Sequence, residues 1–400
     1  MAQFKEKIII SIVGLTNVGK STLFNLISGQ KGKAIVDSKS GTTADNVNTT
    51  MEIHGLGVVK LIDTAGIEED GVLGDKKRIK TKHAINVSDL VLFVIKDNKT
   101  NFTDREKEFL DYIKQQSKQV LFINNCFNND TVKVKEKTLT LNANNFDNQL
   151  KITNFIIENI NLKKEQVDLL PDVKVENSYV LLVIPLDEES PELRLLRPQS
   201  MVIERLLKKF AMPILYRPNL KNFNKEDFIN VLDDLKNSKN GLSMVITDSQ
   251  VVGQIASYIP KNINFTTFSI LMTNFMSNGK IDYMLNSLKT LDNLNKNDNI
   301  LIVEACKHDR KCDDIATVKI PNLLKKYTGK NLNIKYNFGN VFPTEEEIYN
   351  GNYKLVIMCG SCMIDKQEYQ NRLRIFSKFN IPTINYGMFF SYINNHNCIF

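Results

Sequence analysis

The sequence predicts an α/β protein of three domains, the first of which contains a doubly wound, mostly parallel sheet. Apolar, β-branched runs typical of buried parallel strands recur along the chain, and helical patterns separate them. The first such run, residues 8–13, leads directly into a glycine-rich loop and then into a helical pattern. The 400 residues are enough for two or three domains with sizeable cores.

The glycine-rich loop has the G-x-x-x-x-G-K-[ST] spacing of a phosphate-binding motif. Its residues are Gly14, Leu15, Thr16, Asn17, Val18, Gly19, Lys20, Ser21 and Thr22. The glycines let backbone N–H groups converge on an anion, and the following helix N-terminus adds partial positive charge. We expect Lys20 to reach the β- and γ-phosphates and Ser21 to bind Mg²⁺. The simpler alternative, a glycine turn before a surface helix, does not explain the full spacing.

Two further segments complete the predicted nucleotide site. The second of two predicted strands within residues 51–62 leads into Asp63-Thr64-Ala65-Gly66, which resembles the second nucleotide motif of the translation-factor-like GTPases. There Asp63 would hold Mg²⁺ through water and Gly66 would bring its N–H to the γ-phosphate. Thr42 and Thr43 resemble the first switch of these GTPases, in which Thr43 would close on Mg²⁺.

Asn17 narrows the predicted class. In the potassium-activated branch of these GTPases, an asparagine at this position of the loop helps to hold K⁺ beside the phosphates. The ion then supplies the positive charge that an arginine finger supplies elsewhere. The alternative is that Asn17 only tolerates the loop conformation. The resemblance favours K⁺, so Asn17 (through K⁺) and Thr43 are the catalytic candidates.

The predicted base-recognition motif is degraded. Predicted strands at 89–95 and 119–123 continue the sheet, and the second should end in Asn-Lys-x-Asp, whose carboxylate accepts guanine's N–H groups. The chain instead has Asn124-Asn125-Cys126-Phe127-Asn128. One register starts at Asn124 and places Phe127 at the Asp position; the other starts at Asn125 and places Asn128 there. Neither supplies a carboxylate, so we expect weak guanine selectivity, with Asn124 and Asn125 as nucleotide-binding candidates and residues 142–143 as a degraded Ser-Ala motif.

Composition and patterning bound the rest of the chain. The net charge of +7 comes from dispersed Lys and Arg, which favours a solvated basic surface over a nucleic-acid interface. No apolar run approaches the roughly 18 residues of a membrane span, and the first strand runs into the phosphate loop, so we expect a cytoplasmic protein without a signal peptide.

A polar helical stretch at 146–170 ends at Pro171. We therefore predict a domain boundary at this position.

Three cysteines are expected at one sheet edge near the C-terminus. Predicted strands at 299–305 and 353–358 run into Cys306-Lys307-His308 and Cys359-Gly360-Ser361-Cys362. If the strands are parallel, the thiols of Cys306, Cys359 and Cys362 emerge at the same carboxyl edge. Three thiolates suit a 4Fe–4S cluster with an open position, and they equally suit Zn²⁺ with His308 as fourth ligand. Spacing alone does not choose the metal, and buried structural or redox cysteines are the remaining alternatives.

The combination resembles the HydF family, the GTPase maturases of FeFe-hydrogenases. Several stretches carry the resemblance beyond the two sites: residues 183–187, 245–250, 265–271, 304–306 and 385–387. The resemblance implies a 4Fe–4S cluster on Cys306, Cys359 and Cys362, with a labile fourth position that His308 or an exogenous group fills. It also implies three domains: a GTPase domain at 1–168, a dimerisation domain at 172–256 and an iron–sulfur cluster-binding domain at 257–400. Such a protein is a homodimer that binds GTP and hydrolyses it slowly.

The same resemblance implies a scaffold and carrier. Such a protein receives a transient di-iron precursor that is assembled with radical-SAM maturases, and it passes this precursor to the FeFe-hydrogenase apoprotein. Binding and hydrolysis of GTP control its contacts with these partners. Met358 stands where the family often has histidine, so any role of that histidine is lost. The alternative function is a GTPase of RNA modification or ribosome assembly with a structural Cys₃His zinc domain.

Overall fold

The computed structural model describes residues 7–29, 46–67, 71–96, 101–127, 133–162, 167–185, 196–219, 222–305, 314–339, 341–361 and 364–394. The chain divides into two compact units, Met1–Lys164 and Glu165–Phe400. Within the described residues no helix is both long and apolar enough to cross a membrane. The division into two units does not test the predicted domain limits 168, 172 and 256, which stay predictions.

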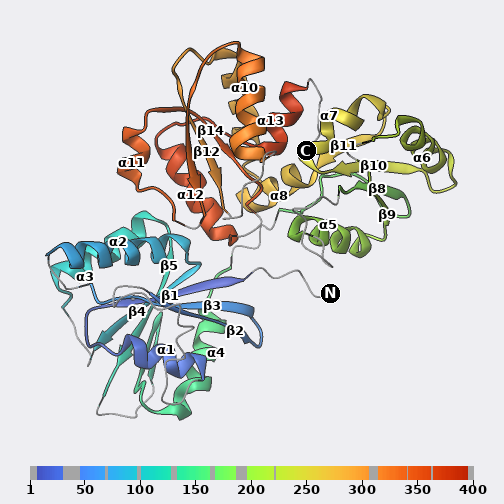
Figure 1. The fold of residues 1–400 in the computed structure, drawn as a ribbon. Helices are drawn as coiled ribbons and strands as arrows, with labels where there is room; N and C mark the ends of the chain where they lie inside the picture. Colours follow the sequence, from blue (N-terminus) through green and yellow to red (C-terminus); the bar gives the residue numbers. More distant parts are fainter. Residues whose placement is uncertain are drawn as a thin grey trace. The chain divides into compact units, whose positions relative to one another are not determined.

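The first unit is a seven-stranded sheet with helices on both faces (Figure 1). Its strand order is β2-β3-β1-β4-β5-β7-β6, and strands β3, β1, β4, β5 and β7 are mutually parallel. The strands are β1 (Ile8–Gly14), β2 (Val47–Ile53), β3 (Gly57–Asp63), β4 (Leu90–Lys96), β5 (Gln119–Asn125), β6 (Lys133–Lys135) and β7 (Thr138–Leu141). The helices are α1 (Lys20–Ser28), α2 (Gly71–Val87), α3 (Asp104–Gln115), η1 (Phe146–Asn148) and α4 (Gln149–Asn159).

The central strand β1 positions the phosphate loop. All seven of its residues are buried, as expected for a parallel strand with helices on both faces. It pairs with β3 on one side and β4 on the other, so its carboxyl end opens between two parallel neighbours. In Figure 1, α2 and α3 cover one face of the sheet and α1 and α4 cover the other. This doubly wound arrangement is the one predicted.

The predicted helical stretch 146–170 is wrong in its second half. Helix α4 ends at Asn159, and residues 160–162 and 167–170 are not helical. The side chain of Gln119 donates to the Asn159 carbonyl at 2.5 Å and accepts from the Asn161 N–H at 2.8 Å. This amide satisfies backbone groups at the helix end, so the chain leaves α4 there despite its continuing polar pattern.

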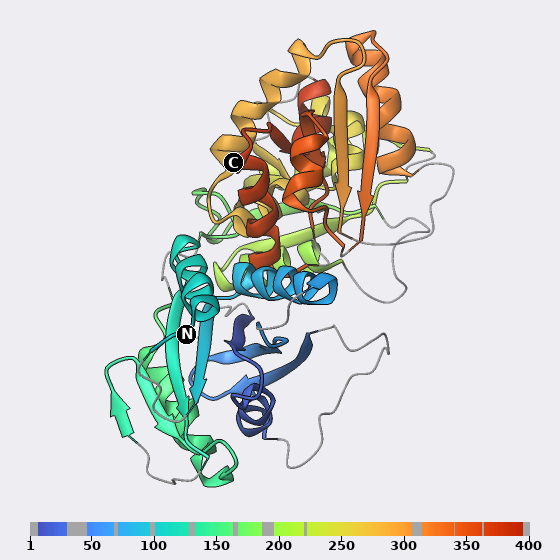
Figure 2. The same cartoon turned by 90° about the vertical axis from the view of Figure 1, so that its left-hand side faces the viewer.

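The second unit contains two four-stranded sheets, each entirely parallel. The first has the order β11-β10-β8-β9 and the second β13-β12-β14-β15. Two strands of the second sheet, β12 and β13, run side by side in the same direction in Figure 2. One hydrophobic core, which includes Val180, Leu271, Val303 and Phe376, contains residues from both sheets.

The elements of this unit alternate strands with helices. The strands are β8 (Tyr179–Val183), β9 (Met212–Tyr216), β10 (Leu242–Thr247), β11 (Asn264–Thr267), β12 (Asn299–Glu304), β13 (Asn333–Phe338), β14 (Tyr353–Met358) and β15 (Thr383–Asn385). The longer helices are α5 (Arg197–Lys208), α6 (Lys225–Asn237), α8 (Phe268–Ser277), α9 (Ile281–Ser287), α10 (Ile320–Thr328), α12 (Lys366–Lys378) and α13 (Tyr386–Ile393). Shorter helical turns are η2 (Ser249–Val251), α7 (Val252–Ile255), η3 (Ala256–Tyr258), η4 (Leu288–Asn293), η5 (Ile315–Lys319) and α11 (Glu345–Asn350).

Candidate nucleotide and cluster sites

The phosphate loop has the strand–loop–helix setting that its motif requires. A Cβ atom on Gly14 would lie 2.6 Å from the Val94 carbonyl oxygen, so the loop leaves β1 too close to β4 for a side chain. Gly19 has φ +92°, a left-handed conformation, and a Cβ there would lie 2.2 Å from the Asn125 amide nitrogen. Asn17 also has positive φ, at 60°, and its side chain is exposed. Both glycines are therefore required by the path of the loop.

The groups assigned to phosphate and Mg²⁺ lie next to one another. The buried Lys20 ammonium donates to the Leu15 carbonyl at 2.6 Å, and Ser21 Oγ donates to Asp63 Oδ2 at 2.6 Å. Burial raises the pKa of Asp63, and the Ser21 hydrogen bond and the Lys20 charge offset part of that effect. The other carboxylate oxygen, Oδ1, is buried without a hydrogen-bond partner among the described residues. A hydroxyl beside a buried carboxylate is a donor set that suits Mg²⁺.

The second nucleotide motif packs directly against the phosphate loop. Thr64 Oγ1 donates to the Ile12 carbonyl at 2.7 Å, which fixes the turn to the central strand. A Cβ on Gly66 would lie 2.2 Å from Thr16 Oγ1, so only glycine allows this approach. Thr42 and Thr43 lie outside the described residues, and their predicted role stays a prediction.

Asn125, and not Asn124, joins the phosphate loop to Ala143 in the predicted Ser-Ala position. Its Nδ2 donates to the Val18 carbonyl in the phosphate loop at 3.0 Å, and its Oδ1 accepts from the Ala143 N–H at 2.9 Å. Asn124 Nδ2 instead lies 3.2 Å from Thr140 Oγ1 and 3.5 Å from Cys126 Sγ. The structure thus favours the register that starts at Asn125, in which Asn128, outside the described residues, takes the Asp position.

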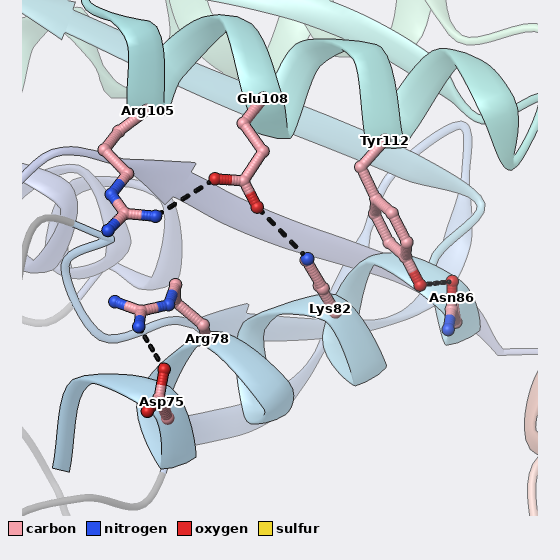
Figure 3. A network of polar contacts seen from close by, with 7 residues as sticks. All are labelled: Asp75, Arg78, Lys82, Asn86, Arg105, Glu108 and Tyr112. Carbon is pink, nitrogen blue, oxygen red and sulfur yellow. Dashed lines mark hydrogen bonds and ion pairs between the residues drawn. The ribbon is translucent and has the colours of Figure 1, made fainter. Parts of the chain in front are cut away.

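A polar network ties α2, the helix after the second motif, to α3 (Figure 3). Glu108 on α3 accepts from Lys82 on α2 and from Arg105, each at 3.2 Å. The Tyr112 hydroxyl on α3 donates to Asn86 Oδ1 at 3.0 Å. Burial acts to raise the pKa of Glu108, but the hydrogen bonds from Lys82 and Arg105 outweigh it and the pKa is lowered. Any movement of α2 with the bound nucleotide would have to carry α3 along or break these contacts.

In the second unit, Cys359 occupies the sheet edge predicted for the cysteines. Strands β12 and β14 are adjacent and parallel, as the prediction requires. The Cys359 sulfur accepts N–H groups from Ala305 and Ser361, each at 3.3 Å. Burial raises the pKa of the Cys359 thiol, and these backbone donors act in the opposite direction. A sulfur that accepts two main-chain N–H groups at a strand end suits a thiolate ligand of a metal or cluster.

The other predicted ligands cannot be placed. Cys306, His308 and Cys362 lie outside the described residues, so the ligand set remains a prediction. Among the residues that are described, no group of three or more His, Cys, Asp or Glu side chains could hold a metal. Met358, at the position where the resembled family often has histidine, is fully buried in β14. It packs in the core that the two sheets share.

A cluster of hydroxyl and amide groups backs the Cys359 turn. We call Ser249, Thr267, Ser269, Thr273 and Asn385 the hydroxyl cluster. Ser269 Oγ accepts from Ser249 Oγ and from the Gly387 N–H, each at 3.0 Å. Asn385 Nδ2 donates to the Ser269 carbonyl at 2.8 Å and to Thr273 Oγ1 at 2.6 Å. A Cβ on Gly360 would lie 3.6 Å from Ser269 Cβ, so the hydroxyl cluster touches the Cys-x-x-C turn.

Sequence reasoning did not find the hydroxyl cluster, although a signal existed. Three of the stretches that carried the family resemblance, 245–250, 265–271 and 385–387, meet at Ser269. Asn385 and Ser269 are 116 positions apart in the chain, so periodicity alone gives no reason to join the third stretch to the other two. A buried pair nearby was missed for the same reason: the Tyr386 hydroxyl donates to Glu304 Oε1 at 3.1 Å.

Three family models match the chain. Residues 9–126 match the model described as 50S ribosome-binding GTPase. Residues 169–276 match the Hydrogen maturase F dimerization domain, and residues 282–398 match the Hydrogen maturase F tetramerization domain. Both hydrogen maturase F models fall in the second unit, and the GTPase model falls in the first.

Individual relatives resemble only part of the chain. GTPase Der of Bartonella tribocorum is 42% identical over 118 residues, 29% of this chain and 24% of that protein. GTPase Der of Caldicellulosiruptor saccharolyticus is 37% identical over 123 residues, 30% of this chain and 27% of that protein. The chain thus spans about a quarter of the length of these curated relatives.

Solved structures give weaker similarity. The G domain of the T. maritima FeoB iron transporter matches with TM-score 0.24 and 22% identity, covering 30% of this chain and 72% of that one. The FeoB G-domain of Methanococcus jannaschii matches with TM-score 0.27 and 18% identity, covering 38% and 99%.

Proposed function

Since this chain belongs to the hydrogen maturase F (HydF) family, we propose that it is a GTP-binding scaffold and carrier for the di-iron precursor of FeFe-hydrogenase. It receives the precursor, which is assembled with radical-SAM maturases, and delivers it to the hydrogenase apoprotein. The family models for its second unit are described as dimerization and tetramerization domains, which supports self-association, with a homodimer as the basic assembly. In this proposal residues 1–168 bind GTP, residues 172–256 form the dimer and residues 257–400 bind the iron–sulfur cluster.

The nucleotide half of the proposal places GTP on the phosphate loop. Lys20 turns from the Leu15 carbonyl to the β- and γ-phosphates, and Ser21, Thr43 and Asp63 hold Mg²⁺, which neutralises charge on the phosphates. Asn17, with its exposed side chain and left-handed backbone, holds K⁺. Hydrolysis is slow and serves as a switch, because the segments that sense the γ-phosphate relax when it leaves.

The cluster half of the proposal places a 4Fe–4S cluster on Cys306, Cys359 and Cys362, with His308 or an exogenous group in the fourth position. The observation that supports it most is the Cys359 sulfur, held by two backbone N–H groups at the carboxyl edge of a parallel sheet. A cluster bound there would supply one exchangeable coordination position. Met358 is apolar and buried, so this chain works without a histidine at that position.

Metal analysis of the anaerobically purified full-length protein tests the cluster half. We expect iron and acid-labile sulfide in similar amounts, with an EPR signal after reduction. Cys359→Ser should lose most of both, whereas Cys126→Ala, a buried cysteine of the first unit, should keep them. Zinc without iron would contradict the proposal.

Capture of partners tests the carrier role. We expect the cluster-loaded protein to retain FeFe-hydrogenase apoprotein on a pull-down, and GTP to change the amount retained. The alternative function in RNA modification or ribosome assembly is not favoured, because the two hydrogen maturase F models span residues 169–276 and 282–398. Retention of ribosomal RNA in place of the apoprotein would reverse that judgement.

A further inference from the structure

The aromatic ring of Phe127 lies beside the phosphate loop. Phe127 lies two positions after Asn125, whose side chain is hydrogen-bonded to Val18 and Ala143. The Phe127 carbonyl accepts a hydrogen bond from Asn142 Nδ2 at 3.4 Å. A Cβ built on Gly19 would lie 3.4 Å from the tip of the Phe127 ring. The ring is only partly buried. It therefore stands next to Gly19, the residue that precedes helix α1, with part of its surface in contact with solvent.

A lysine from the neighbouring strand supports this ring. Lys96 is the last residue of β4, and its ammonium lies 4.9 Å from the centre of the Phe127 ring. An ammonium at this distance interacts favourably with the face of an aromatic ring. β4 and β5 are paired through Lys96 and Asn125, so both groups come from the ends of adjacent parallel strands. Ligands of open α/β sheets bind at such strand ends.

The chemistry of these groups suits a base that is held by stacking and not by its hydrogen-bonding edge. Selection of guanine depends on a carboxylate that accepts two N–H groups, and a site lacking that acceptor loses the discrimination. In the register set by Asn125, the third following residue is Asn128, an amide. Every base has a π face, so stacking on an aromatic side chain tolerates different bases.

We propose that Phe127, supported by Lys96, is the stacking surface for the nucleotide base, so that the site binds nucleoside triphosphates with little preference for guanine. The proposal rests on the nucleotide site proposed above. Phe127 is then a specificity-determining residue: it supplies affinity for the base without identifying it, whereas Lys20 and Ser21 supply affinity for the phosphates.

Calorimetric binding of full-length protein with Mg²⁺ to GTP, ATP, XTP and inorganic tripolyphosphate tests the proposal. For the natural sequence we expect the three nucleotides to bind within about tenfold of one another and tighter than tripolyphosphate. Phe127→Ala should weaken all three nucleotides about ten- to a hundredfold, since stacking contributes ~1–3 kcal/mol per base, and leave tripolyphosphate binding unchanged. Phe127→Tyr, which keeps an aromatic ring at this position, should bind the nucleotides about as tightly as the natural sequence does. Phe210→Ala, at an exposed phenylalanine of the second unit, is the matched control and should change nothing.

The outcomes separate this inference from the nucleotide site itself. If neither tripolyphosphate nor any nucleotide binds the natural protein, the nucleotide site fails. If all bind but Phe127→Ala affects tripolyphosphate as much as GTP, or raises affinity, the stacking role is wrong. A preference for GTP over ATP above a hundredfold in the natural sequence would also overturn it. Asn128→Asp should create such a preference, because it restores the carboxylate acceptor.

Discussion

The nucleotide site and the Cys359 site both lie at the carboxyl ends of parallel strands, but they are held together differently. At the nucleotide site the key side chains bond to each other and to their own loop: Lys20 to the Leu15 carbonyl and Ser21 to Asp63. Most of the site comes from one short motif. At Cys359, the sulfur is held by backbone N–H groups, and the support comes from residues far apart in the chain.

This difference indicates how each site should respond to change. A motif-based site loses its function when one side chain is removed, yet its fold survives, because strand β1 and helix α1 are held by the core. The Cys359 turn instead lies on the hydroxyl cluster between two sheets, so its geometry depends on packing. Substitutions in the first unit should therefore alter binding, whereas substitutions in the hydroxyl cluster should alter stability first.

The largest expected effect is that of Lys20→Ala. Removal of the ammonium takes away a charged hydrogen bond to the phosphates, worth ~1.5–3 kcal/mol, so GTP affinity should fall about ten- to a hundredfold or more. Iron content should be unchanged, because Lys20 belongs to the first unit only. Calorimetry with GTP and iron analysis on the same preparation measure both. If Lys20→Ala lost both its iron and its GTP binding, the two sites would not be independent of one another.

Gly387→Ala should destabilise the second unit. A Cβ there would lie 2.3 Å from Ser269 Oγ and 2.6 Å from Thr267 Oγ1, inside a packed cluster. Overpacking of this kind costs about 1–3 kcal/mol. Gly253→Ala is the matched control, since its Cβ would meet only the Asn394 side chain, at 3.5 Å. Urea unfolding of both variants measures the difference, and equal stability would mean that the hydroxyl cluster is not tightly packed.

The sequence predicted what is local and missed what is assembled over distance. The phosphate loop could be predicted because its spacing fixes a strand, a turn and a helix within a few residues. The choice between Asn124 and Asn125 could not be predicted, because it depends on contacts with Val18 and Ala143, which are distant in the chain. The apolar runs predicted strands β12 and β14, and the cysteine hypothesis assumed that these strands are parallel, which the structure confirms. The role of Ser269 could not be predicted, because its partners lie on separate strands and helices.

Asn125→Ala should weaken GTP binding by about tenfold. The substitution removes the bond to the Val18 carbonyl and leaves the buried Ala143 N–H without its acceptor, which costs ~1–3 kcal/mol of local stability in the free protein. The phosphate loop then has to be reordered when GTP binds, and this cost lowers the affinity. Asn124→Ala is the matched control from the adjacent position, and it should change GTP affinity less than threefold. Titration of both variants with GTP decides the register of the motif. A larger effect at Asn124 would contradict the assignment of Asn125.

The smallest expected effect is a pH-dependent contribution of Asp168 to the stability of the second unit. Arg205 donates to both carboxylate oxygens at 2.7 Å, and Lys209 lies 2.8 Å from Oδ2. Burial acts to raise the pKa of Asp168, but these cations outweigh it and lower the pKa to about 2. The stabilisation is thus present above the ordinary pKa of 3.8 and disappears as the pH falls through about 2.

Because Asp168 and Arg205 keep 30% and 39% of their side-chain surface exposed, solvent screens the pair. We expect no more than about 1 kcal/mol at pH 6. Asp168→Asn should lose this stabilisation at pH 6 and match the natural protein near pH 2, as measured by urea unfolding. Glu204→Gln, which breaks an exposed pair with Lys208 on the same helix, should cost less than about 0.5 kcal/mol. An equal cost for both variants would mean that the paired geometry at Asp168 adds nothing beyond an ordinary surface contact.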